Sequence, residues 1–144
     1  MDRFIIDASV GAKWFVEEEH QEKALYFLER FKKNQCQITV PEIFYAELVN
    51  TFLKKVIKKD LTIDHAVEAI DHLMKLSLDP YSDKELAEVA LENAFRFNVS
   101  VYDGLYLALA EIYLAPLVTA DEELLKACDK RFEFIESLKD ISLE

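Results

Sequence analysis

Three aspartates, Asp7, Asp103 and Asp121, each come directly after a short run of residues typical of a buried strand. Acids occupy 28 of the 144 positions, so chance alone would rarely place one after three such runs. If these strands are parallel, the carboxyl groups meet at one edge of a sheet, where they repel one another and each favours protonation. A divalent cation relieves that repulsion, and hard oxygen ligands with room for water favour Mg²⁺ or Mn²⁺. The pattern therefore predicts an acidic, metal-binding edge.

Glu47 is the candidate for a fourth metal ligand. It lies in the second turn of a helix that we expect to begin at Pro41, close to the carboxyl end of the preceding strand. It flanks an apolar helix face centred on Leu48 and Phe52, and no lysine stands four residues further on. A simple surface ion pair therefore explains this glutamate poorly, and a solvated helix acid is the alternative.

Each aspartate also has a purely structural explanation, because aspartate is favoured at helix starts and in turns. Asp103 could cap the helix that follows it, and Asp7 could be a turn residue. Thr119 and Glu122 have the spacing of a capping box, which would leave Asp121 as a first-turn acid aligned with the helix dipole. These alternatives stay open, but three coincidences at one sheet edge favour a metal site.

The elements that must position these acids alternate between strands and helices. Strands are predicted over residues 3–7, 37–40, 76–78, 99–101 and 117–119, with a last edge strand at 132–135. Helices are predicted around residues 24–31 and over 42–59, 62–74, 83–97, 104–114 and 122–127. The helix at 104–114 is apolar on every side except at Glu111, which indicates a central, buried helix. The alternation predicts an α/β protein with a parallel sheet covered on both faces, whose ligands bind at the carboxyl ends of the strands.

Length and composition limit the class of protein. A chain of 144 residues is the size of one domain, which we place at residues 1–144, since roughly 100–200 residues per domain is usual. Apolar residues make up 51% and charged residues 31%, which excludes a disordered or collagen-like chain. The formal net charge of −11 excludes binding of nucleic acid by broad electrostatic attraction. Any role on nucleic acid must depend on metal ions or on a local basic patch.

The sequence also bears on the compartment. No run approaches the ~18 apolar residues of a membrane span, and the chain start lacks a signal-peptide layout, so we expect a cytoplasmic protein without a membrane partner. Cys36 and Cys128 show no CxxC spacing and have no histidine nearby. They are expected to be reduced packing residues, with an unpaired reactive thiol as the alternative.

Four short motifs in a fixed order carry a family resemblance. They are Asp7-Ala8-Ser9 after the first strand, Ala46-Glu47-Leu48 in an early helix, Tyr102-Asp103 opening an apolar helix, and Thr119-Ala120-Asp121. Each is weak alone, but together they resemble the PIN domain, and the length and order are similar to those of VapC-type toxins of prokaryotic toxin–antitoxin pairs. The resemblance spans nearly the whole chain, from Phe4 to about Ile135.

The resemblance implies a three-layer α/β/α sandwich with a central parallel sheet of about five strands, acting as a metal-dependent endoribonuclease. An acidic quartet of Asp7, Glu47, Asp103 and Asp121 would bind Mg²⁺ or Mn²⁺ and carry out catalysis. Ser9 and Thr119 match positions where the family often has a hydroxyl beside the metal. The implied partners are an RNA substrate, a cognate antitoxin and a second copy of the chain. Whether Glu122 or Glu123 replaces or supplements Asp121 stays open.

The implied chemistry needs neither a histidine nor a serine nucleophile. One or two metal ions would lower the pKa of a bound water and neutralise the scissile phosphate. Metal ions would also make an acidic edge attractive to phosphate. Four basic residues are candidate RNA-phosphate contacts, with solubilising surface charge as the alternative: Lys13, Lys54, Lys55 and Arg96.

Two other classes of function compete with a nuclease. A non-catalytic partner-binding module with a degenerate acidic pocket is disfavoured because all four acids are present. A phosphoacceptor signalling domain also gathers aspartates and a threonine at strand ends, but it needs a lysine just after the last core strand. Here Asp121 is followed by two glutamates, which makes that alternative weak.

Overall fold

The computed structural model describes residues 1–143 and contains a five-stranded, fully parallel sheet with the strand order β3-β2-β1-β4-β5. The strands are β1 (Asp2–Ile6), β2 (Cys36–Pro41), β3 (Asp79–Tyr81), β4 (Leu117–Thr119) and β5 (Ile135–Ser137). The chain builds the sheet outward from β1 to β3 on one side, then crosses back to β4 and β5 on the other. The predicted parallel sheet of about five strands is confirmed.

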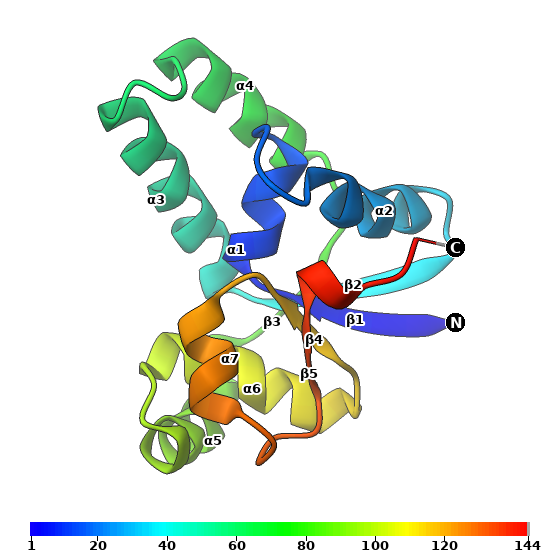
Figure 1. The fold of residues 1–144 in the computed structure, drawn as a ribbon, viewed down its shortest axis with the longest axis vertical. Helices are drawn as coiled ribbons and strands as arrows, with labels where there is room; N and C mark the ends of the chain where they lie inside the picture. The colour runs from blue at the N-terminus through cyan, green and yellow to red at the C-terminus, as the bar shows by residue number, and fades with distance from the viewer. Residues whose placement is uncertain (144) are drawn as a thin grey trace.

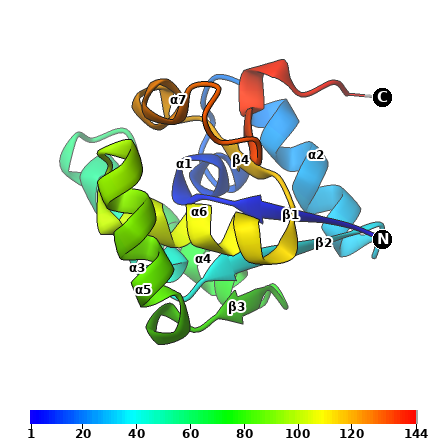
Figure 2. The same ribbon diagram turned by 90° about the horizontal axis from the view of Figure 1, so that it is seen from below.

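Helices cover both faces of this sheet. They are α1 (Ala8–Gly11), α2 (Gln21–Lys32), α3 (Ile43–Ile57), α4 (Ile63–Met74), α5 (Asp83–Phe97), α6 (Val101–Tyr113) and α7 (Glu122–Cys128), with short 3₁₀ helices at Ala12–Trp14 and Leu138–Asp140. Figure 1 shows α1 to α4 on one side of the strands and α5 to α7 on the other, which gives the predicted three layers. Figure 2, seen from below, shows α6 running along the strands with α5 outside it.

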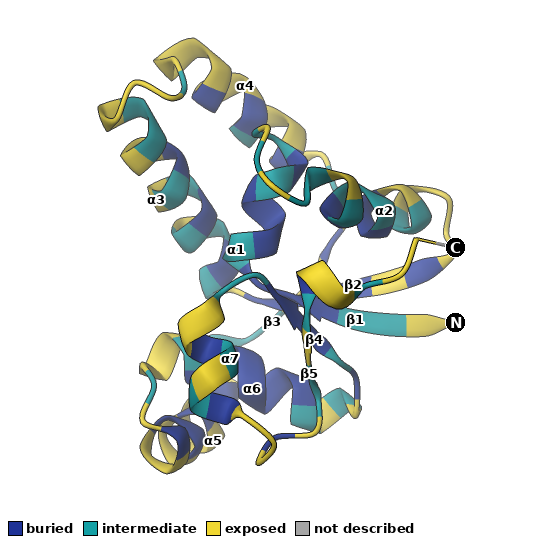
Figure 3. Ribbon diagram, viewed as in Figure 1, coloured by how far each residue is buried: buried dark blue, intermediate teal, exposed yellow. Residues whose placement is uncertain are grey.

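The core is centred on β1, β4 and α6. Ile5, Ile6 and Val118 are fully buried, and so is the middle of α6 from Leu107 to Ala110. Figure 3 shows this burial in α6, whereas the outer turns of α3, α4 and α5 are exposed. The predicted central, buried helix is therefore confirmed, and it begins at Val101 rather than at Gly104.

Both glycines of the chain allow close contact between helices that carry acids. A Cβ on Gly104 would lie 2.3 Å from the carbonyl oxygen of Ala90, so α6 and α5 meet backbone to backbone. A Cβ on Gly11 would lie 2.8 Å from Cζ of Phe44, where α1 meets α3. These approaches set the positions of α6 and α3, on which Asp103 and Glu47 lie.

Several predicted boundaries are wrong. No strand forms at 99–101; Ser100 instead caps α6, and its Oγ accepts a hydrogen bond from the backbone N–H of Asp103. The third strand begins at Asp79, after the predicted 76–78, and the last begins at Ile135 rather than at 132. Pro41 ends β2 instead of opening the next helix. It pairs with Tyr81, whose carbonyl accepts the N–H of Glu42.

Two predictions about compartment are addressed by the structure. Both cysteines are buried and unpaired, as expected of packing residues. In residues 1–143, no helix combines the length and the apolar character that crossing a membrane requires.

Candidate active site

The site is centred between β1 and β4, where the order in which the chain adds strands to the sheet reverses. Ile5 pairs with Leu117 and Ile6 with Val118, so the next step in the register brings Asp7 beside Thr119. The chain leaves β1 toward β2 and returns to β4, so the strand order reverses between β1 and β4. Open α/β sheets bind their ligands at such a switch point.

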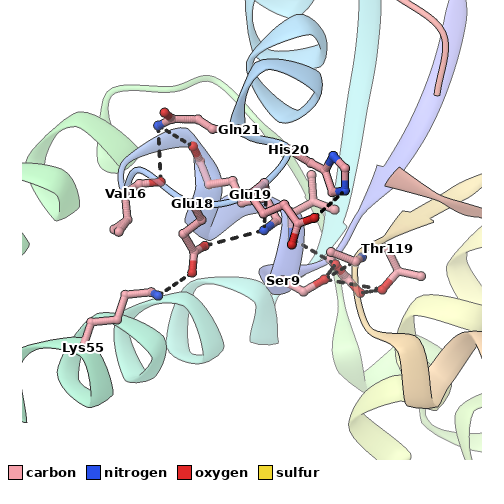
Figure 4. A network of polar contacts seen from close by, with 12 residues as sticks. Ser9, Val16, Glu18, Glu19, His20, Gln21, Lys55 and Thr119 are labelled. Atoms are coloured by element: carbon pink, nitrogen blue, oxygen red, sulfur yellow. Dashed lines mark hydrogen bonds and ion pairs between the residues drawn. The ribbon is translucent and has the colours of Figure 1, made fainter. Parts of the chain in front are cut away.

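Asp7 lies at this switch point, directly after β1, and is held by three donors. It is only 6% exposed and caps α1, because its Oδ1 accepts the backbone N–H of Val10 at 3.2 Å. Ser9 Oγ donates to Oδ1 at 2.6 Å, and Thr119 Oγ1 donates to Oδ2. Figure 4 shows Ser9 and Thr119 turned toward each other, and their hydroxyl oxygens are 3.4 Å apart. The two predicted hydroxyls are therefore both at Asp7.

Burial dominates the titration of Asp7 and raises its pKa from 3.8 to about 6. The three hydrogen bonds favour the ionised form, and the negative charge of Asp121 opposes it. At neutral pH the group is a carboxylate, but one whose charge is poorly solvated. A bound cation would relieve both the desolvation and the repulsion.

Asp121 joins the site from the start of α7. Its Oδ1 accepts the backbone N–H of Glu123 at 3.0 Å and of Leu124 at 3.2 Å, so it is the N-cap of this helix. Thr119 does not cap α7; its Oγ1 accepts the N–H of Asp121 itself at 3.0 Å. The capping-box alternative is therefore wrong. Since both capping bonds use Oδ1, the cap and a role at the acidic edge are compatible.

Asp103 reaches the edge from the first turn of α6. Ser100, and not Asp103, caps this helix, so the capping alternative for Asp103 is also wrong. Burial raises the pKa of Asp103, and the charge of Asp121 raises it further. The two carboxylates therefore share one electrostatic environment, although one lies on α6 and the other on α7.

Glu47 faces the same region from α3. Burial raises its pKa first, and the charges of Asp103 and Asp83 add to this effect. The hydroxyl of Tyr106 donates to Glu47 Oε1 at 2.6 Å and favours the ionised form. A freely solvated surface glutamate is therefore not what the structure shows.

The four predicted acids form an electrostatically coupled row: Asp121 acts on Asp7 and Asp103, and Asp103 acts on Glu47. Among residues 1–143, however, no three His, Cys, Asp or Glu side chains are gathered into a ready-made metal site. The donors still fit Mg²⁺ in kind, because this ion prefers oxygen ligands and keeps several waters, so one or two direct carboxylates suffice. The raised pKa values of Asp7, Glu47 and Asp103 show the uncompensated charge that a cation would neutralise.

The four basic residues predicted to contact RNA fall into two groups. Lys55 Nζ lies 2.5 Å from one oxygen of Glu18, and Lys13 Nζ lies 3.8 Å from the other. Figure 4 shows Glu18 reaching Lys55 on α3. Lys54 and Arg96 are exposed, and the Arg96 guanidinium lies over the ring of Phe97, 4.8 Å from its centroid. Lys13 and Lys55 therefore already have an internal carboxylate partner.

A hollow of about 350 Å³ borders the acidic edge at Ala120 and Glu122. Lys13 lines it together with two basic residues that the sequence analysis did not assign, His20 and Lys139. Glu122 lies at this rim, where its carboxylate is 3.5 Å from Nζ of Lys139. Nothing in the sequence near Asp121 indicates that residues so far apart meet here.

Tyr106 is the main site residue that the sequence analysis missed. It is three residues after Asp103 and therefore on the same helix face. A tyrosine inside a helix that is apolar all round is itself a signal, because a buried hydroxyl needs a hydrogen-bond partner. The identity of that partner, 59 positions away on α3, cannot be derived from this spacing.

Comparison with known families agrees with the fold: the chain belongs to the PIN domain family, whose family model matches residues 4–130. Ribonuclease VapC3 from Pyrobaculum aerophilum is 29% identical over 124 residues, which are 85% of this chain and 92% of that protein.

Solved structures share the fold at low sequence identity. PAE2754 from Pyrobaculum aerophilum superposes with a TM-score of 0.67 at 22% identity, over 96% of this chain and 85% of that one. VapC20 from Mycobacterium tuberculosis, a toxin that cleaves the sarcin–ricin loop, gives 0.62 at 14% identity, over 86% and 94%. VapBC2 from Rickettsia felis, solved bound to a fragment of promoter DNA, gives 0.62 at 17% identity, over 94% and 98%. These likenesses support the PIN fold of the chain.

Proposed function

We propose that this protein is a Mg²⁺- or Mn²⁺-dependent endoribonuclease that hydrolyses RNA phosphodiester bonds and acts as the toxin of a toxin–antitoxin pair. The observation that carries the proposal is the coupled row of Asp7, Glu47, Asp103 and Asp121 at the switch point of the sheet. Membership of the PIN family and the similarity to a protein named Ribonuclease VapC3 support the same class of reaction.

In the proposed mechanism the four acids would hold the cation. When bound, the ion supplies a water of lowered pKa and neutralises charge on the scissile phosphate. Ser9 and Thr119 orient the Asp7 carboxylate, and the amides of α7 fix one oxygen of Asp121. Because the pKa of Asp7 is about 6, this group is ionised at neutral pH and available as a ligand.

The direct test is cleavage of a panel of fluorescent RNAs with Mg²⁺, Mn²⁺ or EDTA, comparing wild type with Asp103→Asn. Asp64→Asn is a matched control, because Asp64 is also a first-turn helix acid but lies exposed on α4. We expect metal-dependent cleavage by wild type and by Asp64→Asn. The Asp103→Asn variant should lose at least about 100-fold in rate, as expected when an electrostatic group at the reaction centre is removed.

Two results would contradict the proposal. Equal cleavage by Asp103→Asn would remove the acidic row from the reaction. A folded wild type that neither binds Mn²⁺ nor cleaves any RNA would favour the alternative, a non-catalytic partner-binding module with a degenerate acidic pocket. Mn²⁺ binding without cleavage would also favour that alternative, unless a wider panel of structured RNAs restores cleavage.

The proposal includes two protein partners and a compartment. The partners are a cognate antitoxin, supported by the likeness to the VapBC2 structure, and a second copy of the chain. A cytoplasmic location would give the enzyme access to cellular RNA and fits two unpaired, buried cysteines.

Expression of the wild-type protein in a bacterial host should arrest growth, whereas expression of the Asp103→Asn variant should not.

A further inference from the structure

Tyr106 connects two acid-bearing helices at the candidate site. The residue is 2% exposed, and its hydroxyl donates to Glu47 Oε1 at 2.6 Å, the short distance typical of a hydroxyl bound to a carboxylate. The bond joins α6 to α3, which lie in opposite layers of the sandwich (Figure 1). It therefore spans the carboxyl edge of the sheet, where the acids meet.

The bond holds the Glu47 carboxylate in a place where neighbouring negative charges repel it. The charges of Asp103 and Asp83 both act against the Glu47 carboxylate, and a long, partly exposed side chain can rotate away from such repulsion. Asp7 is held by Ser9 and Thr119, and Asp121 by backbone amides. The Tyr106 hydroxyl plays the corresponding part for Glu47, and because it engages Oε1, the second oxygen stays available.

We propose that Tyr106 is a positioning residue of the metal site, which holds Glu47 at the acidic edge through one carboxylate oxygen and leaves the other for the cation. The inference rests on the proposed function, since it assigns a role in the same site. It requires no contact between Tyr106 and the metal or the RNA. The tyrosine acts only through Glu47.

The test is the conservative variant Tyr106→Phe, which keeps the ring and removes only the hydroxyl. Mn²⁺ binding to the RNA-free protein is measured by electron paramagnetic resonance, because free Mn²⁺ loses its signal on binding. We expect the affinity to fall by roughly 10- to 100-fold, the usual effect of losing a group that orients a metal ligand. Cleavage at saturating Mn²⁺ should recover most of the wild-type kcat, whereas the Mn²⁺ concentration for half-maximal rate should rise.

Tyr113→Phe is the matched control, because Tyr113 lies at the other end of the same helix. Its ring contacts the Arg3 guanidinium, which lies 4.1 Å from the ring centroid. The Tyr113→Phe variant should bind Mn²⁺ like wild type. In a double-mutant cycle, Tyr106→Phe should have little further effect once Glu47→Gln is present, since the tyrosine acts through that carboxylate.

The outcomes separate this role from the proposed function. Wild-type Mn²⁺ affinity in Tyr106→Phe, or an equal loss in the Glu47→Gln background, would overturn the inference alone. A Tyr106→Phe chain that fails to fold would also overturn it, by showing that the hydroxyl serves the fold. A folded wild type that binds no Mn²⁺ would end the metal-dependent function itself.

Discussion

The acids of this site are held by three kinds of donor: hydroxyls at Asp7, backbone amides at Asp121 and a phenol at Glu47. Such bonds stabilise an ionised carboxylate, whereas burial and neighbouring negative charge oppose it. The raised pKa values of Asp7, Glu47 and Asp103 show that burial and repulsion prevail. The metal-free protein therefore carries electrostatic strain at the very position where a cation is proposed to bind.

This strain predicts how stability depends on pH. The folded-state pKa of Asp7, about 6, exceeds the ordinary value of 3.8, so protonation stabilises the folded state. That contribution is full below pH 3.8 and is lost as the pH rises through 6. The ionised carboxylate then opposes folding by about 3 kcal/mol. In EDTA, the Asp7→Asn variant should gain stability relative to wild type as the pH rises from 4 to 7, measured by urea unfolding.

The control is again Asp64→Asn, which should follow the wild-type pH dependence because Asp64 is exposed. A loss of more than about 2 kcal/mol in Asp7→Asn at pH 7 would contradict the prediction. It would mean that the hydrogen bonds from Ser9, Thr119 and Val10 make Asp7 a structural cap first.

At the scale of elements, two helix contacts set the geometry of the acids. Gly104 lies against the backbone of α5, and Gly11 lies against a side chain of α3. The difference matters because a backbone carbonyl cannot move without displacing its helix, whereas the far end of the buried Phe44 side chain can move without displacing α3.

Gly104→Ala should therefore destabilise the protein more than Gly11→Ala. The added methyl would meet the Ala90 oxygen at 2.3 Å. Overpacking of this kind costs roughly 1–3 kcal/mol. The roughly 1 kcal/mol by which a helix favours alanine over glycine offsets only part of that cost. Urea unfolding of both variants measures the difference. Equal stability of Gly104→Ala and wild type would show that α5 and α6 can separate easily.

The sequence predicted the arrangement of elements better than their ends. Asp7 and Asp121 follow strands as expected, but Asp103 reaches the same edge from a helix. Val99 and Val101 favour a strand by β-propensity, yet Ser100 between them caps α6, and local capping prevailed. The shared position of the acids at one edge could thus be predicted without the correct local structure, because a strand end and a helix start lie at the same edge of a parallel sheet.

Contacts between distant elements could not be predicted in this way. Glu18 binds Lys55 across 37 positions, and Tyr106 binds Glu47 across 59. Both pairs depend on how helices pack, which no local spacing encodes. The predicted role of Lys55 at phosphate must therefore compete with an ion pair that is only visible in three dimensions.

At the scale of the whole molecule, the net charge of −11 and the acidic edge mean that the proposed RNA substrate would be attracted through bound metal ions. The surface also carries apolar side chains that the fold does not cover. On α5, Phe95 is 90% exposed and Leu91 is 62% exposed, and their spacing of four residues puts them on one helix face. Exposed apolar patches commonly mark protein contacts, which supports the proposed homodimer.

Phe95→Glu should therefore convert a dimeric protein to a monomer, because it places a charge at the centre of the proposed contact. Size-exclusion chromatography with light scattering at micromolar concentration measures the mass of each species. Val67→Glu tests the competing apolar face on α4, where Ile63 (61% exposed) and Val67 (59%) are also four residues apart, and this variant should remain dimeric. A monomeric wild type, or dissociation by Val67→Glu alone, would contradict a dimer built on α5. At high dilution both proteins are monomers, and association no longer contributes to stability. The thermal midpoint of Phe95→Glu should then stay close to that of wild type.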